Sequence, residues 1–266
     1  MTLQTAVVGH PISHSLSPLL HNAIYKHEGV DADMHAYDEE DIAAFTEKMR
    51  ALPIHLAAVT LPHKQSVMQY VDEIDARASD IGAVNTLLNT DGVLRGYNTD
   101  IVGIEAALKG VQVSGKDVLL LGAGGAAYPV AYYLKFKGAH VFYHNRTKEK
   151  AEEMRSRFGG VVEDDLSSIS PGRFSLIVNA TSVGLKLSDP LPIREELITK
   201  DTTVLDLIYT ETPLLKHTSA KGARAISGLS MFVAQGLEQE RLWLDREIRD
   251  YGYTALLQDA LQKQSI

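Results

Sequence analysis

The chain contains no cysteine among its 266 residues. This absence excludes disulfides, thiol catalysis and cysteine-ligated metals. The sequence also lacks an apolar run of about eighteen residues, the length that a membrane-spanning helix needs. Its first residues show no basic segment followed by an apolar stretch, so we expect no secretion signal. We therefore expect a cytoplasmic protein that does not enter a membrane.

Positive charge is scarce, because 26 Lys and Arg residues stand against 34 Asp and Glu residues and give a net charge of −8. Nucleic-acid binding draws on a basic surplus that releases counterions, so we expect no nucleic-acid partner. His10, His14 and His21 lie close in sequence, but their spacing fits no helical pair and no carboxylate cluster accompanies them. Since zinc sites need three or four convergent ligands, we predict no metal site and ordinary packing or surface roles for these histidines.

Strand-like and helix-like segments alternate along the chain, which predicts an α/β fold with mainly parallel sheets. The expected strands are 3–9, 35–38, 55–60, 118–121, 139–144, 175–179, 204–207 and 224–226, with a hairpin of 85–88 and 93–96 around an Asp-Gly turn. The expected helices are 17–28, 39–52, helical segments up to 81, one from 100, and 126–137, 231–249 and 253–263. Two terminal helices without a strand suit packing back onto the first domain. We expect one mixed α/β domain of residues 1–103 and 236–266, and a second, Rossmann-type domain of residues 104–235.

A glycine turn follows the apolar run 118–121 in the second half and reads Gly122-Ala123-Gly124-Gly125-Ala126. Glycine clusters often mark only a tight turn. Here the turn follows a strand-like run, opens a helical segment and precedes another β-rich segment, which is the context that a dinucleotide's pyrophosphate requires. The pattern therefore predicts a nucleotide site. Tyr128-Pro129 is unusual at this point, because a proline must lie in the first helical turn or distort the helix.

The next strand ends in Asn145-Arg146-Thr147, with Lys148 and Lys150 close behind, where NAD-binding chains carry an acidic residue. A carboxylate there would repel a ribose 2′-phosphate, whereas a guanidinium can hold one through paired hydrogen bonds. An exposed arginine is usually only solvated surface, but the position of Arg146 at the strand end favours binding. The predicted cofactor is NADP.

Several blocks of the sequence together resemble those of shikimate dehydrogenases, in that family's order and over nearly the whole chain. They are His10-Pro11-Ile12-Ser13-His14-Ser15-Leu16-Ser17-Pro18, Val59-Thr60-Leu61-Pro62-His63-Lys64, Gly82-Ala83-Val84-Asn85-Thr86, Gly96-Tyr97-Asn98-Thr99-Asp100, Asn179-Ala180-Thr181-Ser182-Val183-Gly184, Asp206-Leu207-Ile208-Tyr209 and Gly228-Leu229-Ser230-Met231-Phe232-Val233-Ala234-Gln235. The resemblance implies NADP-dependent reduction of 3-dehydroshikimate to shikimate, a step of chorismate and aromatic amino acid biosynthesis.

The resemblance also implies roles for individual residues. Lys64 and Asp100 would be catalytic and would handle the proton. The substrate would be bound by Ser15, Ser17, Thr60, Lys64, Asn85, Asp100, Tyr209 and Gln235. NADP would be bound by Gly122, Ala123, Gly124, Gly125, Ala126, Asn145, Arg146, Thr147, Lys150, Thr181, Gly228 and Met231.

Read locally, the same residues allow plainer roles. Lys64 could be a solvated side chain, and Asp100 could be a helix cap. Ser15 and Ser17 could serve as turn and cap residues, and Met231 could belong to the core. Three functional alternatives stay open at this point: a paralogue acting on quinate, one acting on an aminated shikimate, and a non-catalytic NADP-binding sensor on the same fold. We expect a monomer or a homodimer.

Overall fold

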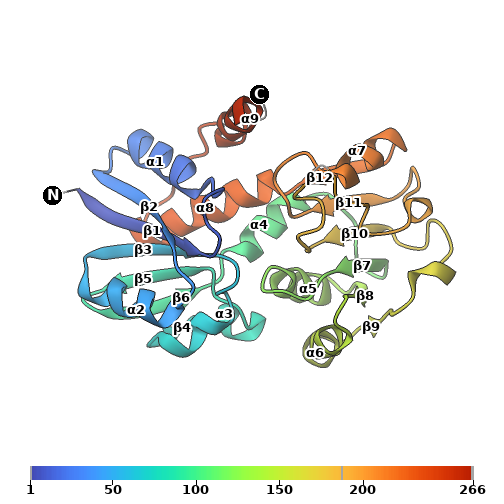
Figure 1. Cartoon of the computed structure of the whole chain (residues 1–266), viewed down its shortest axis with the longest axis horizontal. Coiled ribbons are helices and arrows are strands. Elements are labelled where there is room, and N and C mark those ends of the chain that lie inside the picture. Colours follow the sequence, from blue (N-terminus) through green and yellow to red (C-terminus); the bar gives the residue numbers. More distant parts are fainter. Residues whose placement is uncertain (1, 187, 265–266) are drawn as a thin grey trace. The chain divides into compact units, whose positions relative to one another are not determined.

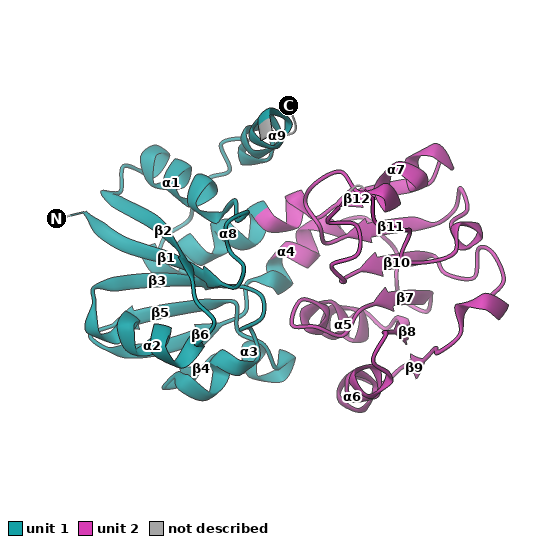
Figure 2. Cartoon of the chain, viewed as in Figure 1, with its two compact units in different colours: residues 1–102, 233–266 teal, residues 103–232 magenta. Residues whose placement is uncertain are grey.

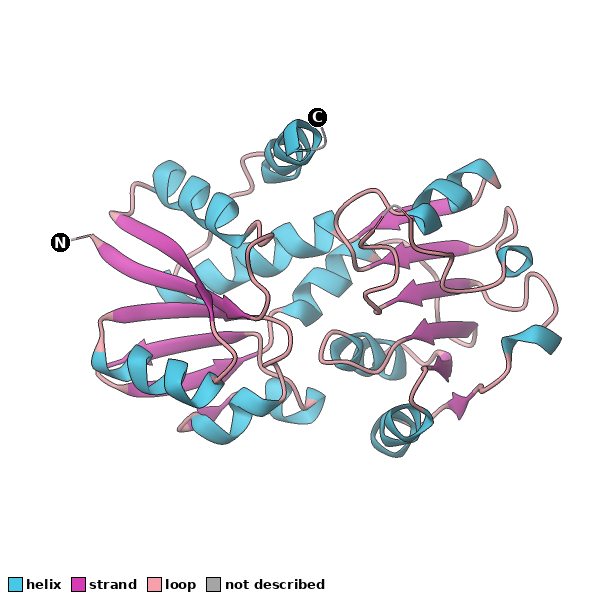
Figure 3. Cartoon of the chain, in the orientation of Figure 1, coloured by secondary structure: helices cyan, strands magenta, loops and turns pink. Residues whose placement is uncertain are grey.

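The computed structural model describes residues 2–186 and 188–264. It divides into two compact units, one of residues 1–102 and 233–266 and one of residues 103–232 (Figure 2). Each unit is built on a six-stranded sheet with helices against it, so the predicted α/β fold class is confirmed (Figure 3). None of the helices in the described ranges has the length and apolar character that crossing a membrane would require.

The first unit contains a mixed sheet with the strand order β2-β1-β3-β5-β6-β4. Its strands are β1 (Leu3–Gly9), β2 (Ala32–Asp38), β3 (Ile54–Val59), β4 (Glu73–Ile74), β5 (Thr86–Thr90) and β6 (Val93–Tyr97). β1 runs parallel to β2 and β3, whereas β5 is antiparallel to both β3 and β6. The predicted hairpin is confirmed, and its tip residues Asp91 and Gly92 have φ of 52° and 86°, the left-handed values that suit an Asp-Gly turn.

Helices cover both faces of this sheet. They are α1 (Ser17–Glu28), α2 (Ile42–Ala51), the short 3₁₀ helix η1 (Ser66–Tyr70), α3 (Ala76–Ile81) and the later part of α8 (Leu229–Leu244), while α9 (Tyr253–Gln264) packs against α1. Because successive strand residues point to opposite faces, Ala6 and Val8 of β1 pack with Phe45 of α2, whereas Val7 packs with Tyr25 of α1. The unit therefore has two hydrophobic cores, one on each side of the sheet.

Several predicted boundaries in this unit were wrong for local reasons. α2 begins at Ile42 rather than Glu39, because the Asp41 side chain caps it by accepting hydrogen bonds from the amides of Ala43 and Ala44. The α8 helix ends at Leu244 rather than Arg249. Residues before 81 are not all helical, since the two-residue strand β4 pairs with β6. Such a short edge strand has no visible alternation in sequence.

The start of α1 also differs from the prediction that Ser17 caps it. Leu16 is the capping residue, and Ser17 is already the first helical residue. The hydroxyl of Ser15 accepts a hydrogen bond of 3.2 Å from the amide of Ser17. Ser15 therefore supports the beginning of α1, while Ser17 is buried within its first turn.

The second unit contains an all-parallel sheet with the order β12-β11-β10-β7-β8-β9 (Figure 1). Its strands are β7 (Asp117–Leu121), β8 (His140–His144), β9 (Val161–Val162), β10 (Leu176–Asn179), β11 (Thr203–Asp206) and β12 (Arg224–Ser227). Its helices are α4 (Asp100–Ala107, from residue 103), α5 (Ala127–Phe136), α6 (Lys148–Phe158), η2 (Leu166–Ser168), η3 (Glu195–Leu197), α7 (Pro213–Ala220) and the start of α8. Counted within the unit, this strand order is 3-2-1-4-5-6, the doubly wound order of dinucleotide-binding folds. β8 and β9 lie on one side of β7, and β10, β11 and β12 lie on its other side, so the strand order reverses between β7 and β10. Ligands of such folds bind at the carboxyl ends of the strands at this point.

Candidate active site

Lys64 and Asp100 form the centre of a polar cluster in the first unit. Lys64 follows a turn beyond β3 in which the amide of His63 donates to the carbonyl of Thr60. The Lys64 ammonium donates a hydrogen bond of 2.5 Å to Oδ2 of Asp100. The two side chains are only 15% and 5% exposed, so the ion pair is largely shielded from water. A shielded ion pair of this kind is stronger than a surface pair and holds both groups in place.

Asn85 connects this pair to its surroundings. Its amide nitrogen lies 3.0 Å from Oδ1 of Asp100, 2.9 Å from Oγ1 of Thr99 and 3.2 Å from Oε1 of Gln235. Its side-chain oxygen Oδ1 accepts a hydrogen bond of 2.7 Å from the backbone amide of Thr99. Both oxygens of Asp100 therefore accept hydrogen bonds, one from a cation and one from a neutral amide. Four residues that the sequence resemblance singled out, Lys64, Asn85, Asp100 and Gln235, belong to one hydrogen-bonded cluster.

Sequence reasoning missed Thr86, Thr99 and Gln239 as members of this cluster. The side-chain amide of Gln239 donates to the backbone carbonyl of Asn85 at 3.1 Å and to the hydroxyl of Thr86 at 2.9 Å. Gln235 and Gln239 are four residues apart, so they lie on the same face of α8. Two glutamines four residues apart in one predicted helix were the signal that could have identified Gln239.

The remaining first-unit candidates lie at ends of neighbouring elements. Ser15 and Ser17 lie at the beginning of α1, and Thr60 lies directly beyond β3, where its amide donates to the carbonyl of Val8 at 2.9 Å. Gly9, at the end of β1, has no room for a side chain, because a Cβ there would lie 2.5 Å from Cγ2 of Thr60. These close contacts fix the loops at the carboxyl ends of β1 and β3.

The glycine turn of the second unit lies where the strand order predicts a ligand. Gly122 has φ of +97°, and its amide donates to the carbonyl of His144. Gly124 is exposed, and a Cβ there would meet nothing within 4 Å. α5 begins at Ala127, so Pro129 falls in the first turn without distorting it. The first four amides of a helix have no intrahelical partner. Here the amide of Ala127 already donates to the carbonyl of Gly124 and Pro129 has no amide hydrogen, so the remaining amides at this turn and helix start are the candidates to donate hydrogen bonds to a phosphate.

The loops after β10 and β11 are held by a buried carboxyl group. Asp206 is fully buried, and burial raises its pKa above the ordinary value. Its oxygens accept hydrogen bonds of 3.0 Å from Asn179 and 2.7 Å from Thr212. The Thr181 hydroxyl in turn donates to Oδ1 of Asn179 at 2.7 Å. The hydrogen bond of Thr181 therefore helps to fix the shape of the loop beside the glycine turn.

The end of β8 presents a cationic surface. Arg146 is exposed, and within residues 2–186 and 188–264 its guanidinium forms no ion pair, whereas Lys148 is paired with Asp164. The Asn145 amide donates a hydrogen bond of 2.7 Å to the carbonyl of Thr147, which is the capping residue of α6. Lys150 is exposed in the first turn of that helix. The site thus combines an accessible guanidinium with a helix N-terminus, and both attract a phosphate.

The other predicted residues of the second unit lie around β11 and the start of α8. A Cβ on Gly228 would lie 2.2 Å from the carbonyl oxygen of Leu207, so only glycine fits there. Met231 is buried, and a Cβ on Gly103 would lie 2.5 Å from its carbonyl oxygen. The ring of Tyr209 lies 5.2 Å from that of Phe232. Tyr209 belongs to the second unit, unlike the other predicted substrate residues.

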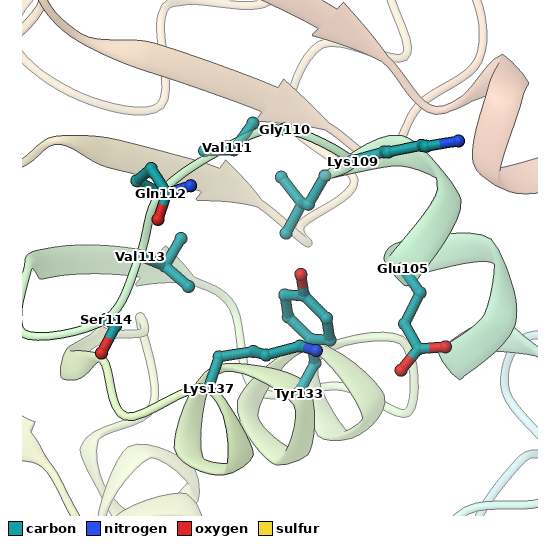
Figure 4. A pocket seen from close by; sticks show the side chains of 10 residues that line it. Glu105, Lys109, Gly110, Val111, Gln112, Val113, Ser114, Tyr133 and Lys137 are labelled. Atoms are coloured by element: carbon teal, nitrogen blue, oxygen red, sulfur yellow. The ribbon is translucent and has the colours of Figure 1, made fainter.

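The second unit also has a surface hollow of about 480 Å³ that is unrelated to this site (Figure 4). It is lined by Glu105, Tyr133, Lys137 and the segment 108–114, which leads into the amino end of β7. Ligands of doubly wound sheets bind at the opposite, carboxyl ends of the strands. In the described part of the chain, no group of three or more His, Asp or Glu side chains is arranged to hold a metal ion.

Comparison with known proteins gives a consistent result along the chain. Residues 7–87 match a family described as the shikimate dehydrogenase substrate binding domain, and residues 105–182 match one described as shikimate/quinate 5-dehydrogenase. The chain is 40% identical to the shikimate dehydrogenase (NADP(+)) of Aquifex aeolicus, over 91% of each chain. A crystal structure of shikimate dehydrogenase from that organism superposes with a TM-score of 0.88, over 93% of this chain and 94% of that one.

A second solved relative is the shikimate 5-dehydrogenase of Thermus thermophilus in complex with NADP(H) and shikimate. It is 33% identical, covers 98% of this chain and 99% of its own, and has a TM-score of 0.86. The 5-ketofructose reductase of a Gluconobacter strain is 31% identical over 99% of both chains, with a TM-score of 0.83. The sequence resemblance is confirmed, and the chain belongs to the shikimate dehydrogenase family.

Proposed function

We propose that this protein catalyses the reversible, NADP-dependent reduction of 3-dehydroshikimate to shikimate. The observation that carries the proposal is the shielded Lys64 and Asp100 pair, whose members lie 2.5 Å apart and whose carboxylate is also bonded to Asn85. A ketone that accepts a hydride becomes an alkoxide, so it needs a proton donor and a stabilising positive charge at its oxygen. Lys64 supplies both. The names of the relatives and the shikimate bound in one of them support the same substrate.

The surrounding side chains suit a polyhydroxylated ring with a carboxylate. Lys64 donates its proton to the ketone oxygen, and Asp100 holds the ammonium in place while accepting from a ring hydroxyl. Asn85, Gln235 and Thr60 form hydrogen bonds with the ring hydroxyls of the substrate. We assign the substrate carboxylate to Ser15, Ser17 and Tyr209. Such a polar lining is required because each buried polar group left without a partner costs about 1–3 kcal/mol.

The second unit is proposed to hold NADP. Its residues fit the cofactor, because the glycine turn 122–126 leaves a helix N-terminus accessible and Arg146 offers an exposed guanidinium, without an ion pair among the described residues, for a 2′-phosphate. When bound, NADPH supplies the hydride for the reduction. Asn145, Thr147 and Lys150 complete the 2′-phosphate site, while Thr181, Gly228 and Met231 shape the remaining surface. In this scheme the first unit, residues 1–102 and 233–266, forms the substrate domain, and the second unit, residues 103–232, forms the cofactor domain; the expected bounds of 103/104 and 235/236 lie within three residues of these.

The cellular setting follows from the reaction. A biosynthetic NADPH-dependent reduction belongs in the cytoplasm, and its partners are the small substrate and the cofactor rather than a nucleic acid or a membrane. We propose a monomer or a homodimer, which size-exclusion chromatography with light scattering distinguishes.

The test is turnover of the purified protein with NADPH and a panel of ketones. The panel contains 3-dehydroshikimate, 3-dehydroquinate, the amino analogue of 3-dehydroshikimate and 5-ketofructose, the last because a 5-ketofructose reductase shares this fold at 31% identity. The highest kcat/KM is expected for 3-dehydroshikimate. A higher value for another ketone reassigns the substrate. Binding of NADP without turnover of any member would identify a sensor instead of an enzyme.

A further inference from the structure

A second polar network lies in the first unit and does not include the Lys64 and Asp100 cluster. Glu240 of α8 is fully buried, and its Oε1 is hydrogen-bonded to Nδ1 of His21 and accepts from the hydroxyl of Tyr25 at 2.9 Å. His21 and Tyr25 are both buried on α1. The Tyr25 hydroxyl is also 2.9 Å from Oγ1 of Thr5 in β1. The network therefore ties α8, α1 and β1 together.

The two helices approach each other closely at the same point. A Cβ on Gly236 would lie 2.6 Å from Cδ2 of Leu20, so a larger residue there would force the Leu20 side chain to move. About two turns further along α8, the Trp243 ring packs edge-on against Tyr25, with 5.7 Å between ring centres. Apolar contacts of this kind hold helices together but allow sliding and rotation. The hydrogen bonds of Glu240 are directional, so they fix how α8 is rotated and where it lies along α1.

Both helices of this contact carry or adjoin residues that we assign to the substrate. Ser17 is the first residue of α1 and Ser15 lies just before it, and α8 carries Gln235 five residues before Glu240. A small slip or rotation of α8 against α1 would move the Gln235 carboxamide relative to both serines. A shift of about 1 Å is enough to take a hydrogen-bonding group out of contact distance and so to weaken substrate binding.

Stability alone does not account for this network. A buried pair of ionisable side chains is often no better for stability than two well-packed apolar side chains of similar volume. Here Nε2 of His21 and Oε2 of Glu240 are buried and lack a hydrogen-bond partner within the described residues, which adds an unfavourable contribution. We infer that Glu240, held by His21 and Tyr25, is a positioning residue that sets the register of α8 for substrate binding. This inference rests on the function proposed for the site.

The test compares the wild type with the double variant His21→Leu/Glu240→Met, whose apolar side chains fill a similar volume. We expect a melting temperature at or above that of the wild type, a KM for shikimate raised about tenfold, and little change in kcat or in the KM for NADP. The single variant Glu240→Gln, which keeps an oxygen acceptor in place, is expected to retain a KM near that of the wild type. Thr5→Val is the matched control, because it removes a bond to Tyr25 without touching Glu240.

A double variant that folds and keeps the wild-type KM for shikimate overturns the inference. If the double variant does not fold, the isosteric change Tyr25→Phe decides: its KM for shikimate must rise severalfold at constant kcat, and an unchanged KM overturns the inference. Wild-type turnover is measured first, so a failure of the proposed function is seen separately. Amide hydrogen exchange in residues 15–20 and 233–240 adds a readout that needs no substrate. The exchange must become faster in the double variant, in which the hydrogen bonds that fix α8 against α1 are lost.

Discussion

Gly122 lies so close to Ala180 that a Cβ on the glycine would be 2.8 Å from the alanine's carbonyl oxygen. This contact joins the turn after β7 to the loop after β10, at the point where the strand order reverses. Gly124, two residues later, has open space around it and no positive φ. The two glycines of one motif therefore serve different purposes: Gly122 is required by the fold, and Gly124 leaves room for a ligand.

This difference gives a paired prediction. Gly122→Ala combines a left-handed φ with a backbone clash, so it should lower the free energy of unfolding by about 1–3 kcal/mol. Gly124→Ala should change that free energy by less than about 0.5 kcal/mol, yet it should weaken NADP binding, because the new methyl group occupies the path of the pyrophosphate. Denaturant unfolding and NADP titration of both variants check this. Equal loss of stability in the two would contradict the assignment.

Replacing Lys64 by Ala should lower kcat by about 10²- to 10⁴-fold, the usual range for acid–base help, because the proton donor at the ketone oxygen is lost. The affinity for NADP should change much less. Steady-state kinetics measure both values, and Lys109→Ala, an exposed lysine away from the cluster, is the control. Unchanged kcat in Lys64→Ala would remove this residue from the mechanism.

The double change Ser15→Ala and Ser17→Ala should weaken shikimate binding, since each charge-assisted hydrogen bond to a carboxylate contributes about 1.5–3 kcal/mol. NADP binding should hardly change. Calorimetric titrations with both ligands provide the measurement. Ser13→Ala is a matched control from the same loop, because Ser13 is exposed and precedes the helix. If the double variant lost NADP affinity and kept shikimate affinity, these serines would lie away from the substrate.

How far the sequence predicts this structure depends on the range of the interaction concerned. The glycine turn could be predicted because a strand, a turn and a helix are consecutive in the chain. The same holds for the β5 and β6 hairpin, whose Asp-Gly tip is local. The hydrogen bond between His21 and Glu240 joins residues 219 positions apart, and no local sequence pattern predicts such a distant partner.

Glycines at close contacts show a similar limit. Gly228 is required because the backbone of Leu207 comes close to it, and Gly236 lets the Leu20 side chain pack against α8. These distances exist only in the folded chain. Within the candidate site, the family blocks supplied Lys64 and Asp100, whereas Gln239 could have been found only from its helical spacing to Gln235. Tertiary packing therefore determines the part of the site that sequence patterns leave out.

His10 should titrate at a higher pH than a free histidine. Its Nδ1 lies 2.7 Å from Asp38 and its Nε2 lies 3.0 Å from Glu40, and the hydrogen bond with Asp38 is the main reason that its pKa is raised above 6.5. Because the folded pKa exceeds the unfolded one, the contribution of this pair to stability is complete below pH 6.5 and is lost as the pH rises through the folded pKa. NMR titration of the imidazole measures this, and Asp38→Asn should lower the pKa. No response to that change would contradict the pairing.

Cofactor choice is the sharpest test of the second unit. Arg146 is exposed at the end of β8 beside the N-terminus of α6, where an NAD-binding chain would carry an acidic residue. If its guanidinium holds the 2′-phosphate through two hydrogen bonds, Arg146→Ala should weaken NADP binding by about ten- to hundredfold. NAD lacks that phosphate, so its affinity should change little.

The control for this variant is Lys148→Ala. Lys148 is two residues away and already paired with Asp164, so its loss should affect NADP less than the loss of Arg146 does. Lys150 is exposed and unpaired in the described ranges, and it can preserve part of the preference in Arg146→Ala. Measuring kcat/KM with NADPH and NADH for the wild type and for the single variants Arg146→Ala, Lys148→Ala and Lys150→Ala separates these contributions. A wild type that prefers NADH, or an Arg146 variant impaired equally with both cofactors, would show that the strand end does not select the phosphate.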